Sequence, residues 1–316
     1  MQFLNPRTDL AFKKIFGSDQ SKDILLSFLN AVLTLSSPIA DVTIVDPYQA
    51  PKVVGMKESA VDVRAVDENG RQFIIEMQVL NVNGFEKRVL YNACKAYAGQ
   101  IRSGEDYQKL SDVIALTITD FTMFAERPEG INSFRLKADD GGLYSDDLEL
   151  VFIELPKFHG EEADLATMDL KDKWLFFLKH AKDLSIVPES LQQIPSFVHA
   201  FAIANRAALT PAEEDEQTRR EFYIYQHKEF ARMNDEVMAM HNSLVQALAE
   251  GKAEGKAEGK AEGKAEGKAE GLAEGARETA LTIAKSLLPI MPDDAAIAAV
   301  TGLAVLDVAT LRVNQD

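Results

Sequence analysis

The chain contains 316 residues, of which 46% are hydrophobic and 27% are charged, as in an ordinary soluble globular protein. Its formal net charge of −16 by itself argues against a nucleic-acid binder. The single cysteine, Cys94, excludes an intramolecular disulfide and no apolar run is long enough to cross a bilayer, so we expect a cytoplasmic protein with no membrane partner.

The first part of the chain alternates between helical and β patterns. Apolar residues at three- and four-residue spacing predict helices at residues 7–16 and 21–35. A short β-rich run, VTIVDPYQ, follows at residues 42–49. Residues 59–80 contain two further β runs joined at Asn69-Gly70, a dipeptide typical of tight hairpins.

The next segments continue this mixed pattern. One helix and three strands are predicted, in chain order, at residues 84–102, 111–121, 132–137 and 149–154. From residue 170 to about residue 249 the pattern is mainly helical, and we expect Trp174 and the pair Phe176–Phe177 in the core. This order of elements predicts an α/β fold with a mixed core and a helical extension.

Residues 249–275 repeat the four letters AEGK. Ala, Glu and Lys favour a helix, whereas each interior glycine costs about 1 kcal/mol relative to Ala. The four-residue period also places Lys beside Lys and Glu beside Glu along a helix, which disfavours it. We interpret the repeat as a weakly helical, solvated spacer. The alternative is a helical stalk whose Gly and Ala stripes pack against a second copy.

The last segment, residues 276–316, is predicted as a small helical unit. Two short helices around Thr301-Gly302-Leu303 resemble a helix-turn-helix hairpin. A DNA-reading helix should carry basic or amide side chains, and this one offers only Arg312, near its end. We therefore favour an oligomerisation or docking element over a DNA reader, and expect a homo-oligomer formed through the C-terminal region.

The strand at residues 73–80, FIIEMQVL, carries two polar side chains among apolar ones. Residues two apart share a face of a strand, so Glu76 and Gln78 point the same way. The opposite face, directed at the core, is expected to carry Phe73, Ile75 and Met77. Burying an unpaired amide costs about 1–3 kcal/mol, and a charge costs more, so both polar residues need partners.

Asp62 is expected almost opposite Glu76 across the hairpin, with Val61 and Val63 on the other face of its strand. Two like charges in that position are destabilising unless something neutralises them. A divalent cation would do so, because Mg²⁺ is typically held by one or two carboxylates with waters and phosphate oxygens.

The alternative is a set of ion pairs at a solvated sheet edge. The two carboxylates would then pair with Lys or Arg, for example Lys57, Arg64, Arg71 or Lys95. The local composition permits this, because residues 1–110 hold 13 Lys+Arg and 13 Asp+Glu. Spacing alone leaves both interpretations open.

The pattern D-x13-E-x-Q on consecutive strands, between two helices, resembles the PD-(D/E)XK nuclease superfamily. More narrowly, the chain resembles the recombination-promoting nuclease (Rpn) or transposase-like family of that superfamily. The resemblance covers most of residues 1–180 and, more loosely, the tail. It is carried by NPRTDLAFKKIFG, KESAVDVRAVDENGRQFIIEMQ, FEKRVLYNACKAYAGQ, KWLFFLKHA and the charged, glycine-containing repeat.

The resemblance implies a restriction-endonuclease-like core, in which helices flank a mixed sheet. On this basis we expect a nuclease-like core at residues 1–160 and a helical extension at 161–248. The AEGK repeat, as a linker or stalk, would follow at 249–275 and the small helical unit at 276–316.

The resemblance also implies metal-dependent hydrolysis of DNA phosphodiester bonds. Asp62, Glu76 and the backbone carbonyl of Met77 would hold Mg²⁺, or Mn²⁺ or Ca²⁺ in its place. Gln78 stands where most members of the superfamily have lysine. A lysine would supply a positive charge near the attacking water, whereas a glutamine orients the water or donates a hydrogen bond.

Further candidates come from the two helices that flank the hairpin. Asp9 would add a third acidic group, although an Asp in a first helical turn also favours the helix dipole, and Glu58 competes for the same role. Arg88 is a candidate for binding the scissile phosphate. Lys13 and Lys14 are candidate phosphate contacts. For these three basic residues the alternative is a solvated surface side chain.

We favour a Mg²⁺-dependent DNA endonuclease associated with recombination or mobile elements. A second hypothesis is a catalytically weak or inactive nuclease-fold protein that binds DNA or a protein partner. Gln78 and the acidic middle of the chain favour the second hypothesis, since residues 111–250 hold 13 Lys+Arg against 26 Asp+Glu. A third hypothesis is a structural protein that oligomerises through the repeat and the C-terminal helices.

Overall fold

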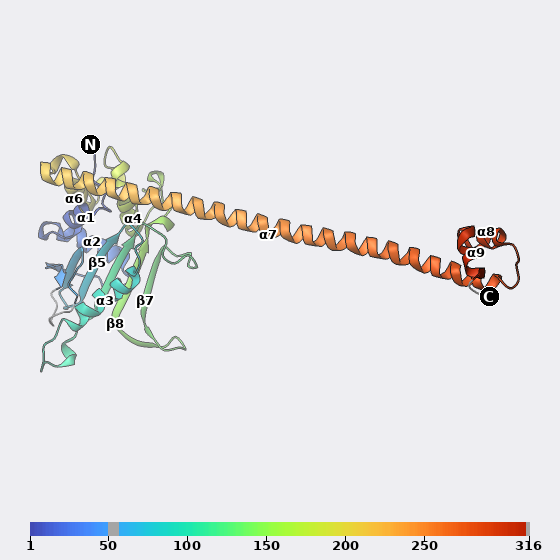
Figure 1. The fold of residues 1–316 in the computed structure, drawn as a ribbon. Coiled ribbons are helices and arrows are strands. Elements are labelled where there is room, and N and C mark those ends of the chain that lie inside the picture. Colours follow the sequence, from blue (N-terminus) through green and yellow to red (C-terminus); the bar gives the residue numbers. More distant parts are fainter. Residues whose placement is uncertain (50–56, 314–316) are drawn as a thin grey trace. The chain divides into compact units, whose positions relative to one another are not determined.

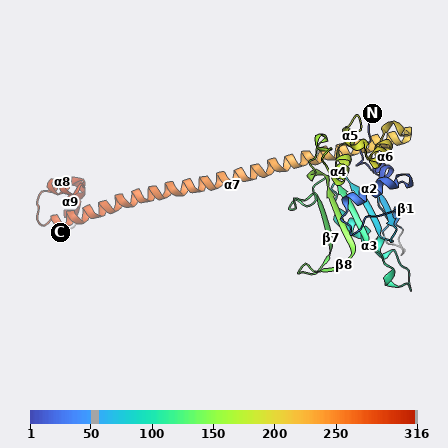
Figure 2. The same ribbon diagram turned by 180° about the vertical axis from the view of Figure 1, so that it is seen from behind.

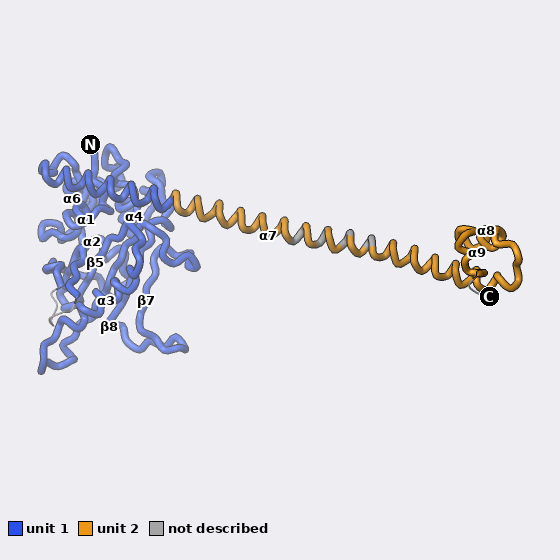
Figure 3. Tube along the Cα trace, viewed as in Figure 1, with its two compact units in different colours: residues 1–232 blue, residues 233–316 orange. Residues whose placement is uncertain are grey.

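The computed structural model describes residues 1–49 and 57–313. It divides into two units, residues 1–232 and 233–316, which Figure 3 distinguishes by colour. Each unit has a hydrophobic core of its own. No helix among the described residues combines the length and the apolar character that a membrane span requires.

Six strands of the first unit form one mixed sheet in the order β1-β4-β5-β6-β8-β7 (Figure 1). The central strands β5, β6 and β8 run parallel, so their carboxyl ends meet at one edge of the sheet. The other pairings in the sheet are antiparallel. The strands are β1 (Val42–Val45), β4 (Val63–Asp67), β5 (Gln72–Gln78), β6 (Val113–Thr119), β7 (Ile131–Lys137) and β8 (Leu143–Glu154), with a separate pair of β2 (Tyr48–Gln49) and β3 (Ser59–Ala60).

The helices of the first unit surround this sheet. They are α1 (Asp9–Phe16), α2 (Lys22–Val32), α3 (Phe85–Ala98), α4 (Leu170–His180), α5 (Glu189–Gln192), α6 (Pro195–Ile203) and the first part of α7 (Pro211–Leu287). Short 3-10 helices span Asp19–Ser21, Tyr107–Lys109, Leu155–Lys157, Glu162–Asp164, Ala181–Asp183 and Arg206–Ala208.

Helices cover both faces of the sheet. Helices α1, α2, α4 and α6 pack on the face that presents Phe73 and Ile75, whereas α3 packs on the opposite face, against Ile74 (Figures 1 and 2). This double cover explains why all seven residues of β6, VIALTIT, are buried, five of them apolar and two of them threonines. The predicted fold class, a mixed α/β core with a helical extension, is confirmed.

Trp174 lies at the centre of the helical side of the core. Its ring stacks on Phe197 of α6 with 4.1 Å between ring centroids, and also contacts Phe16 and Phe28. Trp174, Phe176 and Phe177 are buried, as the sequence predicted. Because the chain has one tryptophan, its fluorescence reports on the folding of this unit.

The hairpin of β4 and β5 sets the position of the polar residues on β5. The turn at residues 68–70 is closed by hydrogen bonds between Asp67 and Arg71 and between Gly70 and Asp67, and Gly70 adopts a φ of +85° that favours glycine. Val63 pairs with Ile75, so Asp62 adjoins Glu76, as the sequence predicted.

The chain changes face immediately before β4, which the sequence pattern did not reveal. Val63 belongs to the core beneath α1 and α2, whereas Val61 packs with Ile74 and Ala93 on the α3 side. The prediction that Val61 and Val63 share a face was therefore wrong. The physical reason is that Asp62 lies at a bend between β3 and β4, where the strict alternation of a strand does not apply.

The second unit is helical. It contains the later part of α7, which includes residues 249–275, together with α8 (Asp294–Thr301) and α9 (Val305–Val313). Gly302 links the last two helices with a φ of +73°. Its core includes Leu288, Ile297 and Val308. Arg312 is engaged in structural contacts within this unit, because it binds Asp294 and the carbonyls of Leu288 and Met291.

Two of the predicted domain boundaries lie inside a helix. Helix α7 runs through the expected boundaries at residues 248 and 275 without a break. The division into 1–160, 161–248, 249–275 and 276–316 stays a prediction.

Candidate active site

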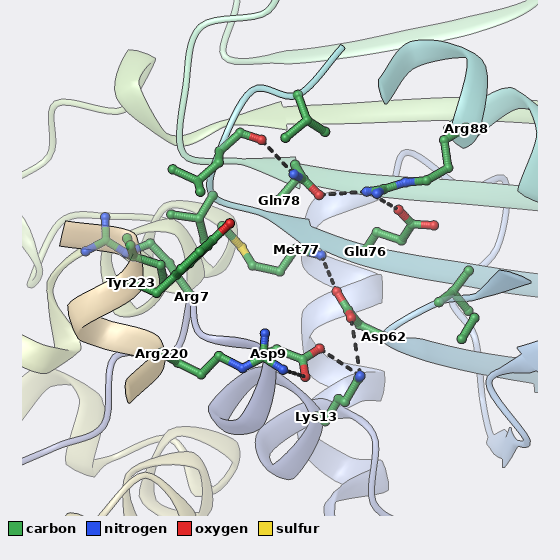
Figure 4. A pocket seen from close by; sticks show the side chains of 16 residues that line it. Arg7, Asp9, Lys13, Asp62, Glu76, Met77, Gln78, Arg88, Arg220 and Tyr223 are labelled. Carbon is green, nitrogen blue, oxygen red and sulfur yellow. Dashed lines mark hydrogen bonds and ion pairs between the residues drawn. The ribbon is translucent and has the colours of Figure 1, made fainter. Parts of the chain in front are cut away.

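A pocket of about 430 Å³ opens at the carboxyl end of β5 (Figure 4). Its floor is formed by the end of β5 and by the bend before β4, and helices α1, α3 and α7 contribute side chains around it. The lining contains seven of the candidate residues, namely Asp9, Lys13, Asp62, Glu76, Met77, Gln78 and Arg88. Residues far apart in the sequence therefore meet at one site.

The Asp62 carboxylate is fixed against the edge of β5. Its Oδ2 atom accepts a hydrogen bond of 2.8 Å from the backbone N–H of Met77, and its side chain is 18% exposed. Burial raises the pKa of Asp62 to about 7, and a side-chain hydrogen bond to Asp9 adds to this effect by favouring the protonated form. Without a cation, this carboxyl therefore resists ionisation.

Glu76 is the second buried carboxylate of the pocket. Asn92 of α3 donates a hydrogen bond of 2.7 Å to its Oε1 atom, and the Arg88 guanidinium lies 3.6 Å from its Oε2 atom. Burial raises the pKa of Glu76, although Asn92 and Arg88 act in the opposite direction. Asn92 follows Arg88 by one helical turn, so the same face of α3 holds both groups.

Gln78 links β5 to α3 and to the following loop. Its Nε2 atom donates to the carbonyl of Leu80 at 2.6 Å, and its Oε1 atom accepts from Arg88 at 2.7 Å. The amide therefore holds Arg88 in place. Arg88 itself is 45% exposed and lies over the ring of Phe85, so its guanidinium remains accessible from the pocket.

A cluster of charges on the α1 side completes the site. Lys13 lies 2.7 Å from Asp9 and 3.7 Å from Asp62, and Arg220 of α7 lies 3.8 Å from Asp9. Burial alone would raise the pKa of Asp9, but Lys13 lowers it below its ordinary value. Burial would lower the pKa of Lys13, but Asp9 and Asp62 raise it. Lys13 is thus held as a cation.

Other candidates lie outside this pocket. Lys14 forms an ion pair with Glu213 of α7, and Glu58 is not part of the lining. The predicted ion-pair partners of the two carboxylates have other contacts. In the described part of the chain, Arg64 binds Gln72, Arg71 pairs with Asp67 and Asp112, Lys95 binds Gln49, Lys57 and Ser59, and no ion pair joins Lys57 to either carboxylate.

The four residues named as examples do not pair with the carboxylates, but the alternative of ion pairs with Lys or Arg is borne out in part, because Lys13 pairs with Asp62 and Arg88 pairs with Glu76. Asp62 and Glu76 are largely buried, and Lys13 and Arg88 are the cations beside them. The reason is that α1 and α3 pack across the end of the hairpin, which spacing within the hairpin could not show.

The sequence interpretation missed the contribution of α7 and of the first loop. Arg220, Tyr223 and Ile224 of α7 line the pocket, as does Arg7, which lies 2.9 Å from Asp120 at the end of β6. Arg7 belongs to the motif NPRTDLAFKKIFG, so its position beside Asp9 was a usable signal. No local pattern connects residues 220–224 with the hairpin.

The donor set of the pocket fits a hard divalent cation. Asp62 is a partly buried carboxylate and Glu76 is a buried one beside it, and their ion-pair contacts are long, at 3.7 and 3.6 Å. Mg²⁺ requires only one or two protein carboxylates when waters and substrate oxygens complete its shell. A site closed by protein alone is not present, because no group of three or more His, Cys, Asp or Glu residues suited to a metal occurs among the described residues.

Comparisons with known proteins agree with this geometry. The family described as PD-(D/E)XK nuclease family transposase matches the chain over residues 6–233. The matched range contains every residue that lines the pocket. No curated protein and no solved structure gives a match.

We predict that Asp62→Asn stabilises the metal-free protein. The pKa of Asp62 is raised to about 7 in the folded state from 3.8, so the wild type loses stability as the pH rises between these values. At pH 8 in EDTA the free energy of unfolding of the variant should be about 1–4 kcal/mol higher than that of the wild type, and the difference should vanish near pH 4. Urea titrations followed by Trp174 fluorescence measure it.

Asp41→Asn is the matched control, because Asp41 is an exposed aspartate outside the pocket. Its effect should stay within about 0.5 kcal/mol at both pH values. A loss of stability in Asp62→Asn at pH 8 would contradict the assignment of Asp62 as a strained, buried carboxyl.

Proposed function

Because the chain belongs to the PD-(D/E)XK nuclease family transposase family, we propose that it is an endonuclease that hydrolyses DNA phosphodiester bonds with a divalent cation. One observation carries the proposal. Asp62 and Glu76 converge on a pocket at the carboxyl end of β5, and basic side chains surround them. Among the described residues, those basic side chains are Arg7, Lys13, Arg88 and Arg220.

The combination of charges suits a phosphodiester and a metal ion together. Two buried carboxylates without tight counter-ions are costly for folding, so a cation-binding role accounts for them better than a structural one. The basic side chains would attract and orient the DNA phosphate. An association with recombination or mobile elements follows from the transposase-like character of the family.

Asp62, Glu76 and the Met77 carbonyl would hold Mg²⁺, with Mn²⁺ or Ca²⁺ as alternatives. A divalent cation at this position would polarise the scissile phosphate and lower the pKa of a bound water. Arg88 would bind a non-bridging phosphate oxygen, and Gln78 would keep the guanidinium in position. Asp9 would hold Lys13 in place beside Asp62.

Lys13 would supply the positive charge that Gln78 lacks. The Gln78 amide binds the Arg88 guanidinium and the Leu80 carbonyl and carries no charge, so it cannot supply a positive charge to the attacking water. The Lys13 ammonium, in contrast, lies 3.7 Å from Asp62 and lines the pocket. It can stabilise charge that develops on the phosphate or on the attacking water.

A catalytically weak protein that binds DNA or a protein partner is the second candidate function. Gln78 favours it, because a neutral amide stands where most members of the superfamily have lysine, and this amide is bound to Arg88 and Leu80. The two candidates differ in whether purified protein cleaves DNA. A cytoplasmic location, expected from the single cysteine, stays a prediction.

We predict that the purified protein nicks supercoiled plasmid DNA in Mg²⁺ or Mn²⁺ and is inactive in EDTA. Glu76→Gln and Asp62→Asn should each lower the rate at least about 100-fold, because each removes a charged ligand of the cation. Asp41→Asn should cleave like the wild type. Undiminished cleavage by Glu76→Gln, or cleavage in EDTA, would overturn the proposed site.

We predict separate effects for the two adjacent lysines of α1. Lys13→Met should lower the cleavage rate at saturating DNA about 10- to 1,000-fold, and Lys13→Arg should restore part of it, because the positive charge is retained. Lys14→Met should weaken DNA binding, if Lys14 contacts phosphate as predicted, without changing that rate. Equal rates for Lys13→Met and the wild type would remove Lys13 from the mechanism.

The expected homo-oligomer has a specific candidate surface in the second unit. Helix α7 presents apolar residues spaced by four and three in turn, at Met233, Val237, Met240, Leu244 and Ala247. The four larger side chains are 49%, 65%, 68% and 56% exposed. A stripe with this 3.5-residue period packs best against an identical stripe, as in a coiled coil. We propose that a second copy of this chain covers it.

We predict that the wild type has at least twice the chain mass of 34.9 kDa in solution. The double variant Val237→Asp/Leu244→Asp should be monomeric by light scattering, because it places charges in the seam.

Asn242→Asp is the control for this experiment. It adds a negative charge on the exposed face opposite the stripe and should leave the mass unchanged. A monomeric wild type, or an unchanged mass in the double variant, would contradict the proposed seam.

A further inference from the structure

The wall that α7 contributes to the pocket contains no carboxylate. Arg220, Tyr223 and Ile224 lie at positions three and four apart, so they share one face of the helix. In Figure 4 the labelled residues Arg220 and Tyr223 reach toward the pocket from α7, on the side away from Arg88. The two walls therefore offer different groups to whatever lies between them.

Tyr223 presents an aromatic ring at the mouth of the pocket. The residue is 51% exposed although it lines the cavity. The ring of His227 packs on it with 3.9 Å between centroids and 38° between planes, and the His227 Nδ1 atom contacts the Tyr223 carbonyl at 2.9 Å. An aromatic ring that is supported from within its own helix and open to the pocket is suited to stacking on a nucleobase.

Arg220 adds a cation beside this ring. Its side chain is 50% exposed, and its contact with Asp9 is long, at 3.8 Å. An arginine in a weak, exposed ion pair can exchange that partner for a phosphate, to which it binds with two parallel hydrogen bonds. Arg220 and Tyr223 thus combine phosphate binding with base stacking, the two elements of single-strand recognition.

The depth of the pocket limits how a strand can reach the carboxylates. The side chains of Asp62 and Glu76 are only 18% and 9% exposed. The cavity of about 430 Å³ is in the range of small-molecule sites, so its interior has room for a single nucleotide. The bases of an intact duplex are also stacked on each other, and a protein ring can stack only on a base that has left that arrangement.

We propose that the Arg220–Tyr223 face of α7 binds an unpaired nucleotide of the DNA strand that enters the pocket. Tyr223 stacks on its base, and Arg220 binds a phosphate next to the scissile one. The substrate class is accordingly single-stranded DNA, or DNA with an unpaired or frayed segment. This inference rests on the proposed nuclease function and names the substrate of the same site.

Binding of fluorescent oligonucleotides to the full-length protein tests the proposal. Anisotropy titrations in EDTA, with each oligonucleotide checked by gel for integrity, compare a single strand, a blunt duplex and a duplex with an unpaired tail. The single strand and the tailed duplex should bind at least about tenfold more tightly than the blunt duplex. Equal or tighter binding of the blunt duplex overturns the proposal.

Matched variants on the same helix identify the residues. Tyr223→Ala should weaken single-strand binding about 5- to 100-fold, the range for loss of one stacked base, and leave blunt-duplex binding within about twofold. Tyr223→Phe should retain the affinity. Tyr225→Ala is the control, because Tyr225 is also exposed on α7 but does not line the pocket. Equal effects of Tyr223→Ala and Tyr225→Ala overturn the role of Tyr223.

Arg219, the neighbour of Arg220 in the sequence, provides the control for Arg220→Ala. Arg220→Ala should weaken binding and reduce the slope of log affinity against log salt by about 1, as expected for one lost phosphate contact. Arg219 lies outside the pocket lining and binds the Asp215 carbonyl, so Arg219→Ala should leave both quantities unchanged. An unchanged slope in Arg220→Ala overturns its assignment. Trp174 fluorescence and circular dichroism verify that each variant is folded.

Failure of this inference is distinguishable from failure of the nuclease proposal. If the protein binds single strands through Tyr223 but cleaves no DNA in any divalent cation, hydrolysis fails and the binding site stands. If it cleaves plasmid DNA while Tyr223→Ala binds single strands like the wild type, hydrolysis stands and the binding site fails.

Discussion

The hydrogen bond from the Met77 N–H to the Asp62 carboxylate determines how the rest of the site is arranged. It joins the bend before β4 to the C-terminal end of β5, so the two neighbouring carboxylates lie at the end of that strand. Asp62 is directed toward α1, where Lys13 lies, and Glu76 is directed toward α3, where Asn92 and Arg88 lie. Each carboxylate therefore has its own support while both border one cavity.

The elements that form the site are far apart in the sequence. Helix α1 follows the N-terminus, α3 follows the hairpin, and α7 begins more than a hundred residues later, yet all three contribute side chains to the same pocket. Helices α1 and α3 pack on opposite faces of one sheet, in the cores around Trp174 and Ala93 respectively. Helix α7 is held to α1 by the Lys14–Glu213 ion pair and to the N-cap of α1 by the hydrogen bond between Thr8 and Gln217. A rigid two-sided core of this kind can hold charges that would not be stable on a flexible loop.

The two buried carboxylates oppose folding and support the proposed chemistry. Their burial raises the pKa of Asp62 and of Glu76, which means that the folded state disfavours their charged forms. Strain of this kind is characteristic of functional sites, where a ligand relieves it on binding. The neighbouring cations Lys13 and Arg88 reduce the strain without removing it, because both contacts are long.

The sequence by itself determined the local structure and the hairpin. Periodicity located the helices and strands, and the turn at Asn69-Gly70 fixed the register that brings Asp62 beside Glu76. The tertiary structure alone decided which face Val61 takes, which cations approach the carboxylates, and that Arg220 and Tyr223 of α7 reach the pocket. The physical reason is the distance along the sequence over which each kind of interaction acts. Helical and strand periods are short-range patterns, whereas contacts between α7 and the hairpin depend on how separate elements pack on a shared core.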